Sequence, residues 1–302
     1  MERGRSFVPG HITGFFEVNA DFSDPLRKGS RNCGPCIDAG VLTEVEFEEA
    51  SDTELKIFIN GERRTARTSE AAVRGFLKRF GITGVFKVRH SVQAPVGAGY
   101  GMSGSGALGS VLALSDALNL NLEKEKALIE SHKAEIKSQS GLGDVGPEMV
   151  GGLVLGLEPG APPYGKWEKI SVPEDLGVIC GTFGSLSTSN LLSDSDFKSE
   201  IKRLGKGALD EFLKEKSIYN LMKVSKKFSL NLNIFKRDFE EVMENISSNS
   251  PFGASAVLLG KAIFAPCPRS KIKDLKEVFL DYFKPKDVMI TSIDFRGART
   301  LK

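Results

Sequence analysis

The sequence predicts a two-domain protein of the α+β class. Its 302 residues are too many for one small core and suit two domains packed together. Segments that alternate like strands are mixed with segments of helical periodicity, and no internal repeat is present. Residues 159–163, Pro-Gly-Ala-Pro-Pro, form the best linker. We therefore expect an N-terminal α+β domain at residues 1–163 and a C-terminal α/β sandwich of ferredoxin-like order at residues 164–302.

Charge and hydropathy argue against two classes of partner. The chain has 41 Lys and Arg against 39 Asp and Glu, with the cations scattered along it. This balance provides no electrostatic footprint for nucleic acid or for an anionic membrane. The N-terminus lacks the apolar core of a signal peptide, and the longest apolar stretch, residues 254–265, is too short to span a bilayer. We expect a cytoplasmic protein that binds neither nucleic acid nor membranes.

The first part of the chain predicts strands and a hairpin. Residues 7–16 look like a strand followed by a turn, and a polar, glycine-bearing loop is expected at residues 21–35. Alternating residues predict strands at 41–49 and 55–59. Asn60-Gly61 then gives the strongest short signal for a hairpin turn.

The following elements alternate between helix and strand. Ser69 is the expected cap of a helix that Gly81 ends, because the apolar residues between them recur at helical spacing. The pattern then predicts, in order, a strand at 85–92, a glycine-rich loop at 95–106, helices at 107–118 and 123–138, a second glycine-rich passage at 141–152 and a strand at 153–157. The C-terminal part predicts strands near 167–172 and 177–182, a lysine-rich helical block at 195–245, a strand at 256–264, a helix at 271–283 and a strand at 287–294.

The cysteines indicate a reducing compartment. Four cysteines are too few and too scattered for a disulfide framework. Cys33-Gly-Pro-Cys36 copies the thioredoxin redox motif, which requires a strand before the pair and a helix after it. Here a loop-like segment precedes the pair and a strand-like segment follows it, so the redox interpretation is disfavoured. A zinc site would need a second close pair of ligands, which the sequence lacks. The role of Cys33 and Cys36 stays open.

The glycine-rich loop at residues 95–106 is the most informative segment. Three alternate glycines (97, 99 and 101) permit positive φ and let the backbone come close to an anion. Ser103 and Ser105 fall where a helix begins, and there unpaired amides and the helix dipole favour phosphate. A serine hydroxyl at this position can also reach a magnesium ion that bridges phosphates.

Other interpretations of the loop fit less well. A Walker loop needs Lys directly before its Ser or Thr, and Met102 stands there. A dinucleotide-binding fingerprint needs a second strand after the helix, whereas another helix follows here. A turn without a ligand would not need so many glycines followed by paired serines. The residues alone therefore favour an unusual phosphate loop.

Three further residues are candidates for chemistry. Glu135 lies seven residues after Leu128, and so over the apolar stripe of its predicted helix. It either holds magnesium there or is solvated at a frayed helix end. Asp144 lies in a glycine-rich turn, where it either caps structure or directs an attacking hydroxyl. His11 lies beside Thr13 between two glycines, where a small ligand could come close, whereas the other two histidines are interpreted as structural.

Together these segments resemble the superfamily of galactose, homoserine, mevalonate and phosphomevalonate (GHMP) kinases. Pro9-Gly10-His11 looks like the family's Pro-Gly-Lys or Pro-Gly-Arg, and residues 97–101 with Ser103 look like its Gly-Leu-Gly-Ser-Ser loop. Ala134-Glu135 and residues 140–144 look like its Ala-Glu…Ser-Gly-x-Asp stretch. The resemblance implies the two-domain GHMP kinase fold, with a ribosomal-protein-S5-domain-2-like N-terminal domain and a ferredoxin-like C-terminal domain.

The resemblance also implies roles for the candidate residues. Asp144 would be catalytic, and Glu135 with Ser103, or Ser105 in its place, would hold Mg²⁺. ATP would be bound by Pro95, Gly97, Ala98, Gly99, Gly101, Ser103, Gly104, Ser105 and Gly106. The chain departs from the family at His11, which replaces a cation, and at Met102, which replaces the first loop serine. Residues 250–256 occupy the place of the third motif, with Gly253 as their one glycine.

The amino-acid sequences of residues 9–16 and 101–107 resemble those of one branch, the archaeal pantoate kinases, more than those of the others. That branch makes 4-phosphopantoate on the way to coenzyme A. The expected substrate-binding residues are His11, Thr13, Arg31 and Gly253, with Arg31 meeting the pantoate carboxylate. A kinase for another alcohol, such as homoserine or a mevalonate derivative, and a non-catalytic nucleotide-binding member of the fold stay as alternatives. The resemblance to the superfamily also predicts a homodimer.

Overall fold

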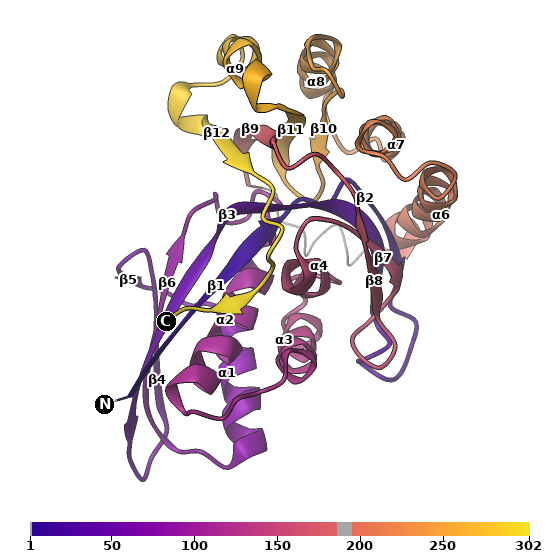
Figure 1. Ribbon diagram of the computed structural model, residues 1–302. Helices are drawn as coiled ribbons and strands as arrows, with labels where there is room; N and C mark the ends of the chain where they lie inside the picture. Colours follow the sequence, from indigo (N-terminus) through magenta and orange to yellow (C-terminus); the bar gives the residue numbers. More distant parts are fainter. Residues whose placement is uncertain (1, 186–194) are drawn as a thin grey trace.

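Residues 2–185 and 195–302 are described by the computed structural model, in which two β-sheets carry the helices on their faces (Figure 1). The larger sheet is built from β1 (Glu2–His11), β2 (Phe15–Asn19), β3 (Gly29–Glu49), β4 (Glu54–Ile59), β5 (Glu62–Arg63), β6 (Gly84–Val92), β7 (Leu153–Glu158), β8 (Lys166–Ile170) and β13 (Arg299–Thr300). The helices of this part are α1 (Arg67–Phe80), α2 (Met102–Ala117), α3 (Lys124–Ser138) and α4 (Val145–Val150).

β3 organises the larger sheet because its 21 residues pair with four other strands. The main path of the sheet runs β13-β1-β3-β6-β4-β5. Along β3, residues 29–33 pair with β2, residues 33–35 with β7, and the later residues with β1 and β6. One strand therefore links the sheet that carries α1 and α2 to the strands that border the second domain.

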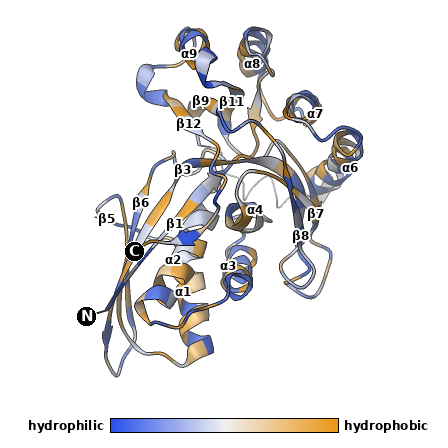
Figure 2. Ribbon diagram, viewed as in Figure 1, coloured by the Kyte–Doolittle hydropathy of each residue, from blue (hydrophilic) through white to orange (hydrophobic). Residues whose placement is uncertain are grey.

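α2 is the central helix of the first domain. It is apolar nearly all round and almost entirely buried, as expected for a helix enclosed by protein on every side. Figure 2 shows hydrophobic residues along α1, α2 and the facing strands. Gly4 lets α2 lie directly against β1, since a Cβ built on it would be 2.1 Å from the Ala113 carbonyl oxygen.

The second sheet has the ferredoxin-like order that the sequence predicts. Its strands run β10-β11-β9-β12, and every neighbouring pair is antiparallel. The elements are β9 (Leu176–Gly184), α6 (Ser195–Phe212), α7 (Ile218–Asn231), α8 (Arg237–Asn249), β10 (Ser255–Val257), β11 (Lys261–Pro268), the 3₁₀ turns η1 (Arg269–Lys271) and η2 (Pro285–Asp287), α9 (Ile272–Leu280) and β12 (Val288–Ser292). Among the described residues, α6, α7 and α8 lie between β9 and β10 in the chain, and α9 precedes β12.

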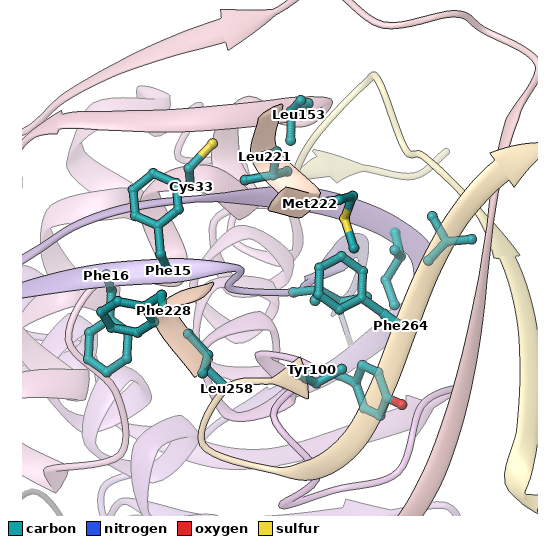
Figure 3. Packing of buried hydrophobic residues seen from close by; sticks show 14 of the residues in the cluster. Phe15, Phe16, Cys33, Tyr100, Leu153, Leu221, Met222, Phe228, Leu258 and Phe264 are labelled. Atoms are coloured by element: carbon teal, nitrogen blue, oxygen red, sulfur yellow. The ribbon is translucent and has the colours of Figure 1, made fainter. Parts of the chain in front are cut away.

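The two parts share one hydrophobic core. Side chains from β2, β3 and β7 pack with side chains from α6, α7 and the second sheet. Figure 3 shows this packing: Phe16 lies against Phe228 and Phe15 lies beside Cys33, while Phe264 lies near Met222. β8 follows the predicted linker and still pairs with β7, and the second sheet starts at Leu176. The division of the chain at residue 163 stays a prediction.

Several local predictions are confirmed. Asn60 and Gly61 have φ of 49° and 85°, and β4 and β5 form the expected hairpin around them. Gly81 ends α1 in the left-handed conformation. The predicted helix at 123–138 is α3. None of the helices in the described residues is long and apolar enough to cross a membrane.

Other boundaries were wrong. The loop predicted to reach Pro35 ends at Lys28, because residues 29–35 pair with β2 and β7 despite their polar and glycine-rich composition. α1 starts at Arg67, so Ser69 is inside it rather than its cap. α2 starts at Met102, five residues before the predicted start. The strand predicted at 256–264 is two strands joined by a turn at residues 258–260.

The cysteine pair lies inside a strand. Cys33 and Cys36 are both buried and free within β3, so the pair does not start a helix as the thioredoxin motif does. Burial raises the pKa of both thiols well above its ordinary value. The redox alternative is therefore wrong, since a reactive cysteine needs an accessible thiolate.

Candidate active site

A pocket lies where the loop before α2 meets β2, β3 and the segment before α4. Its lining consists of Thr13, Phe16, Ser30 and Asn32, residues 97 and 99–104, residues 140–144, and Leu258 and Leu259. The first domain supplies most of these residues, and the turn between β10 and β11 supplies the last two. The pocket therefore collects the glycine-rich loop, Asp144 and Thr13 at one place.

The loop has the backbone conformation that its glycines predict. Gly97, Gly99 and Gly101 have φ of 79°, 89° and 73°, values that side chains disfavour. Gly101 is the residue before α2, so the first amides of that helix have no intrahelical acceptor. Free amides and a helix dipole at a pocket wall are the features that favour an anion such as phosphate.

The second domain holds the loop in place. The Tyr100 hydroxyl lies 2.8 Å from the Thr182 hydroxyl of β9, and Tyr100 is buried in the shared core (Figure 3). A Cβ built on Gly260 would lie 1.9 Å from the Ala98 carbonyl oxygen, so the turn between β10 and β11 touches the loop backbone. Both domains thus fix the loop.

Glu135 is buried beside the loop rather than frayed. It is 1% exposed, and its Oε2 atom has no hydrogen-bond partner. A Cβ built on Gly104 would lie 2.9 Å from Glu135 Oε1, so this glycine lets the helix start reach the carboxyl. Burial, and then the nearby Asp144, raise the pKa of Glu135 well above its ordinary value. Among the residues that the structure describes, Glu135 has no positively charged partner.

The two loop serines have different surroundings. Ser105 is fully buried, and its Oγ lies 2.9 Å from Glu148 Oε1 and 3.0 Å from the Pro9 carbonyl oxygen. Its single proton is therefore already committed to an internal acceptor. Ser103 is exposed and lines the pocket. This difference favours Ser103 over Ser105 as the residue that faces a metal ion.

Asp144 is anchored by His11. The His11 Nδ1 atom lies 2.9 Å from Asp144 Oδ1, and the Thr13 hydroxyl lies 3.5 Å from the same nitrogen. His11 is fully buried, whereas the Asp144 side chain is 27% exposed to the pocket. The second carboxylate oxygen of Asp144 is thus left for a ligand. His11 serves here as a partner of Asp144, at the position where the motif Pro-Gly-Lys or Pro-Gly-Arg has a cation.

Glu148, which the sequence analysis did not single out, lies in the same place. It is fully buried on α4, one helical turn after Asp144. Burial first, then Asp144 and Glu135, raise the pKa of its carboxyl well above the ordinary value. The one signal in the sequence is the four-residue spacing from Asp144, which places the two carboxyls on one face of a helix.

Two expected substrate residues are placed elsewhere. Arg31 makes an ion pair with Glu17 of β2, and its strand neighbours Ser30 and Asn32 line the pocket instead. Successive side chains of a strand point to opposite faces, which accounts for this. Gly253 lines a separate groove beside α7. The roles of Arg31 and Gly253 stay predictions that this geometry does not favour.

The remaining residues of the glycine-rich loop have different surroundings. Pro95 is exposed and Ala98 is buried under the turn at residues 258–260. Gly106 lines a second pocket, which shares Met102, Ser103 and Ser140 with the first. The walls of this second pocket include the apolar residues Val41, Ile59, Ala66, Val92 and Val96.

The donor set fits a magnesium ion that carries nucleotide phosphates. In the part of the chain that the structure describes, no group of three or more His, Cys, Asp or Glu side chains could hold a metal ion. Mg²⁺ needs only one or two protein ligands when phosphates and water complete its shell. Glu135 Oε2, which is buried and unpaired, and the Ser103 hydroxyl meet that requirement.

Comparison with known proteins places the chain in a family. Residues 67–152, which include the loop, Glu135 and Asp144, match the GHMP kinases N terminal domain. A pantoate kinase from Methanocaldococcus jannaschii is 31% identical over 268 residues, covering 89% of this chain and 94% of the relative. This chain belongs to the pantoate kinase family. Another pantoate kinase, from Thermococcus kodakarensis, is 29% identical over 94% of each chain.

Comparison with solved structures shows that this member of the pantoate kinase family has the GHMP kinase fold. A structure described as a phosphotransferase related to the CoA biosynthesis pathway superposes with a TM-score of 0.89 at 26% identity, covering 99% of this chain and 98% of that one. A homoserine kinase from Cytophaga hutchinsonii superposes with a TM-score of 0.74 at 15% identity, covering 100% and 98%, and shows the shared fold alone. The two-domain fold expected from the sequence is confirmed.

Proposed function

We propose that this protein phosphorylates pantoate at its primary hydroxyl with ATP, producing 4-phosphopantoate for coenzyme A synthesis. The observation that carries the proposal is that Asp144 and the phosphate loop line one pocket in a chain of the pantoate kinase family. Phosphoryl transfer depends mainly on positioning and charge stabilisation, and this pocket provides both.

The loop and the start of α2 would bind the triphosphate. Their amides offer hydrogen-bond donors, and the dipole of α2 favours negative charge at its N-terminus. Glu135 and Ser103 would hold Mg²⁺, which neutralises charge on the β and γ phosphates when bound. The second pocket shares Met102, Ser103 and Ser140 with the first, and its apolar wall residues would contact the nucleoside.

Asp144 would direct the pantoate hydroxyl. Its Oδ1 is held by His11, so the carboxylate presents Oδ2 to the acceptor. A carboxylate in this position accepts a hydrogen bond from the hydroxyl and takes up its proton as the oxygen bonds to the γ phosphorus. The bond from that phosphorus to the bridging oxygen breaks, and ADP leaves. His11 therefore acts through Asp144, by fixing its orientation.

The pantoate carboxylate would be recognised by neutral donors. None of the described residues that line the pocket is Lys or Arg. Thr13 and Ser30 offer hydroxyl groups in the pocket, and Phe16 and Leu142 offer apolar surface for the two methyl groups. The Asn32 amide nitrogen already donates to Gly143 and Ser30, so Asn32 positions this wall rather than meeting the carboxylate. Homodimer formation, expected from the superfamily, stays a prediction.

An assay of acceptor alcohols tests this function. ADP production is measured with pantoate, homoserine and mevalonate, each with and without Mg²⁺, and we expect turnover with pantoate and magnesium. In the same assay Asp144→Asn should lower kcat by on the order of a hundredfold or more with little change in ATP affinity. ATP binding without ADP production on any alcohol, or near-normal turnover in the Asp144 variant, would contradict the proposal.

A further inference from the structure

Glu148 carries an unexplained unpaired oxygen beneath the phosphate loop. Its side chain is fully buried, and Oε2 has no hydrogen-bond partner. The other oxygen, Oε1, accepts the Ser105 hydroxyl at 2.9 Å. Buried carboxyl oxygens in folded proteins are normally paired, so an unpaired one beside a ligand pocket indicates a partner that arrives with the ligand.

The surroundings show where that partner would be. A Cβ built on Gly104 would lie 3.1 Å from Glu148 Oε2 and 2.9 Å from Glu135 Oε1. Gly104 itself lines the pocket. Glu148 and Glu135 therefore flank the same glycine at the start of α2, where the proposed cation would be held.

The chemistry of the substrates limits which hydrogen-bond donor could reach Glu148 Oε2. The phosphate oxygens of ATP are acceptors, and the primary hydroxyl of pantoate, which receives the phosphoryl group, is directed to Asp144. A magnesium ion bound by few protein ligands keeps several water molecules, and each of these is a hydrogen-bond donor. A hydrated divalent cation is thus the donor that the filled site would bring to Glu148.

We propose that Glu148 is a positioning residue for the cation, with Oε1 fixing Ser105 and Oε2 accepting a hydrogen bond from a cation-bound water. The inference rests on the proposed function only in needing a metal–nucleotide complex in this pocket. Glu135 contacts the cation directly, and Glu148 orients its water shell. Outer-shell partners of this kind typically change metal affinity by about 10- to 100-fold when mutated.

The test is metal binding measured without turnover. Mn²⁺ replaces Mg²⁺, and electron paramagnetic resonance of free Mn²⁺ reports its affinity in the presence of ADP. In Glu148→Gln the amide oxygen still accepts from Ser105 but the charge is lost. We expect the Kd for Mn²⁺ to rise by about 10- to 100-fold, while ADP affinity without metal, measured by calorimetry, stays within about twofold.

Glu130→Gln is the matched control. Glu130 is also buried, at 7% exposed, but it makes an ion pair with Arg79. The Kd for Mn²⁺ of this variant should therefore equal that of the wild type. Glu148→Asp keeps the charge and retracts the carboxyl, which provides a second variant should Glu148→Gln not fold. We expect weaker Mn²⁺ binding there too.

Wild-type Mn²⁺ affinity in either folded Glu148 variant would overturn the inference. An equal loss of metal-free ADP binding would also overturn it, because Glu148 would then only support the loop. A wild-type protein that binds Mn²⁺ and ADP but does not phosphorylate pantoate would sink the substrate assignment and leave the role of Glu148 intact.

Discussion

The buried histidines have separate tasks at the scale of single residues. His90 is 3% exposed, and its Nδ1 lies 2.9 Å from the Thr43 hydroxyl between β3 and β6. Burial lowers the pKa of His90 from 6.5 to about 4. Burial also lowers the pKa of His132, which contacts the Pro25 carbonyl oxygen. These environments agree with the structural role expected for both, in contrast to His11.

The neutral state of His90 predicts a pH dependence of stability. Between pH 4 and 6.5 the unfolded chain binds the proton that folded His90 does not, so this residue makes the free energy of unfolding rise with pH. The contribution across that window is about 2 to 3 kcal/mol. His90→Gln should remove it, measured as the difference between variant and wild type in urea unfolding at pH 4.5 and 6.5.

The comparison of the variant with the wild type is needed because other buried groups change the stability in the opposite direction as the pH rises. The pKa values of Glu135 and Glu148 are raised in the folded protein, so the folded state binds their protons more tightly and their effect lowers stability as the pH rises above about 4.5. Equal pH dependence in the variant and the wild type would mean that His90 does not carry the effect.

Glu135 and Asp144 could be singled out as candidates from the sequence, whereas Glu148 could not. Both located residues occur in motifs whose local pattern is visible, a helical stripe and a glycine-rich turn. Glu148 accepts a hydrogen bond from Ser105, which is 43 residues earlier in the chain. Local patterns do not specify such a contact, and they do not reveal which carboxyl oxygen is left unpaired.

At the scale of elements, the packing of α6 on β2 shapes the pocket wall. Gly205 of α6 lies against the strand, since a Cβ built on it would be 2.1 Å from the Phe16 carbonyl oxygen. Phe16 also lines the pocket. Gly207, two residues further along the helix, has open space around it.

Two alanine substitutions in α6 should therefore have opposite effects. Gly205→Ala should lower the free energy of unfolding by about 1 to 3 kcal/mol through overpacking and raise the KM for pantoate. Gly207→Ala should raise the free energy of unfolding by about 0.5 to 1 kcal/mol, because alanine restricts the unfolded chain. Urea unfolding and steady-state kinetics measure both, and equal stability of the two variants would show that α6 does not press on β2.

Elements with one clear signal were predictable, and elements set by partners were not. The Asn60-Gly61 hairpin and the Gly81 helix end follow from backbone preferences of those residues. The first half of β3 is a strand because β2 and β7 pair with it, although its glycines and polar residues are typical of a loop. Tertiary pairing there overrides local propensity.

At the scale of the whole molecule, the phosphate loop lies at a seam between two domains. The contact between Tyr100 and Thr182 joins residues 82 positions apart, and the Gly260 turn touches the loop from the second sheet. Sequence periodicity predicts each sheet but not how the two are placed together. The seam therefore emerges only from the folded structure.

Gly260→Ala tests this seam. The new methyl group would collide with the Ala98 backbone and displace the loop, so we expect ATP affinity to fall by about tenfold, or about 1.4 kcal/mol. Lys261→Ala, at the exposed neighbouring position, is the control and should leave ATP affinity unchanged. Unchanged nucleotide binding in the folded Gly260 variant would show that the loop is positioned by the first domain alone.

The pairing of β13 with β1 has a consequence for how the chain is made. Ser6 and Phe7 are paired with Thr300 and Arg299. During synthesis β1 leaves the ribosome before the second sheet, and β13 leaves it afterwards. The β1 edge of the larger sheet therefore stays unpaired until translation is nearly complete. The exposed Arg3 and Arg5 on β1 place charge along that border, which discourages nascent chains from joining edge to edge in the meantime.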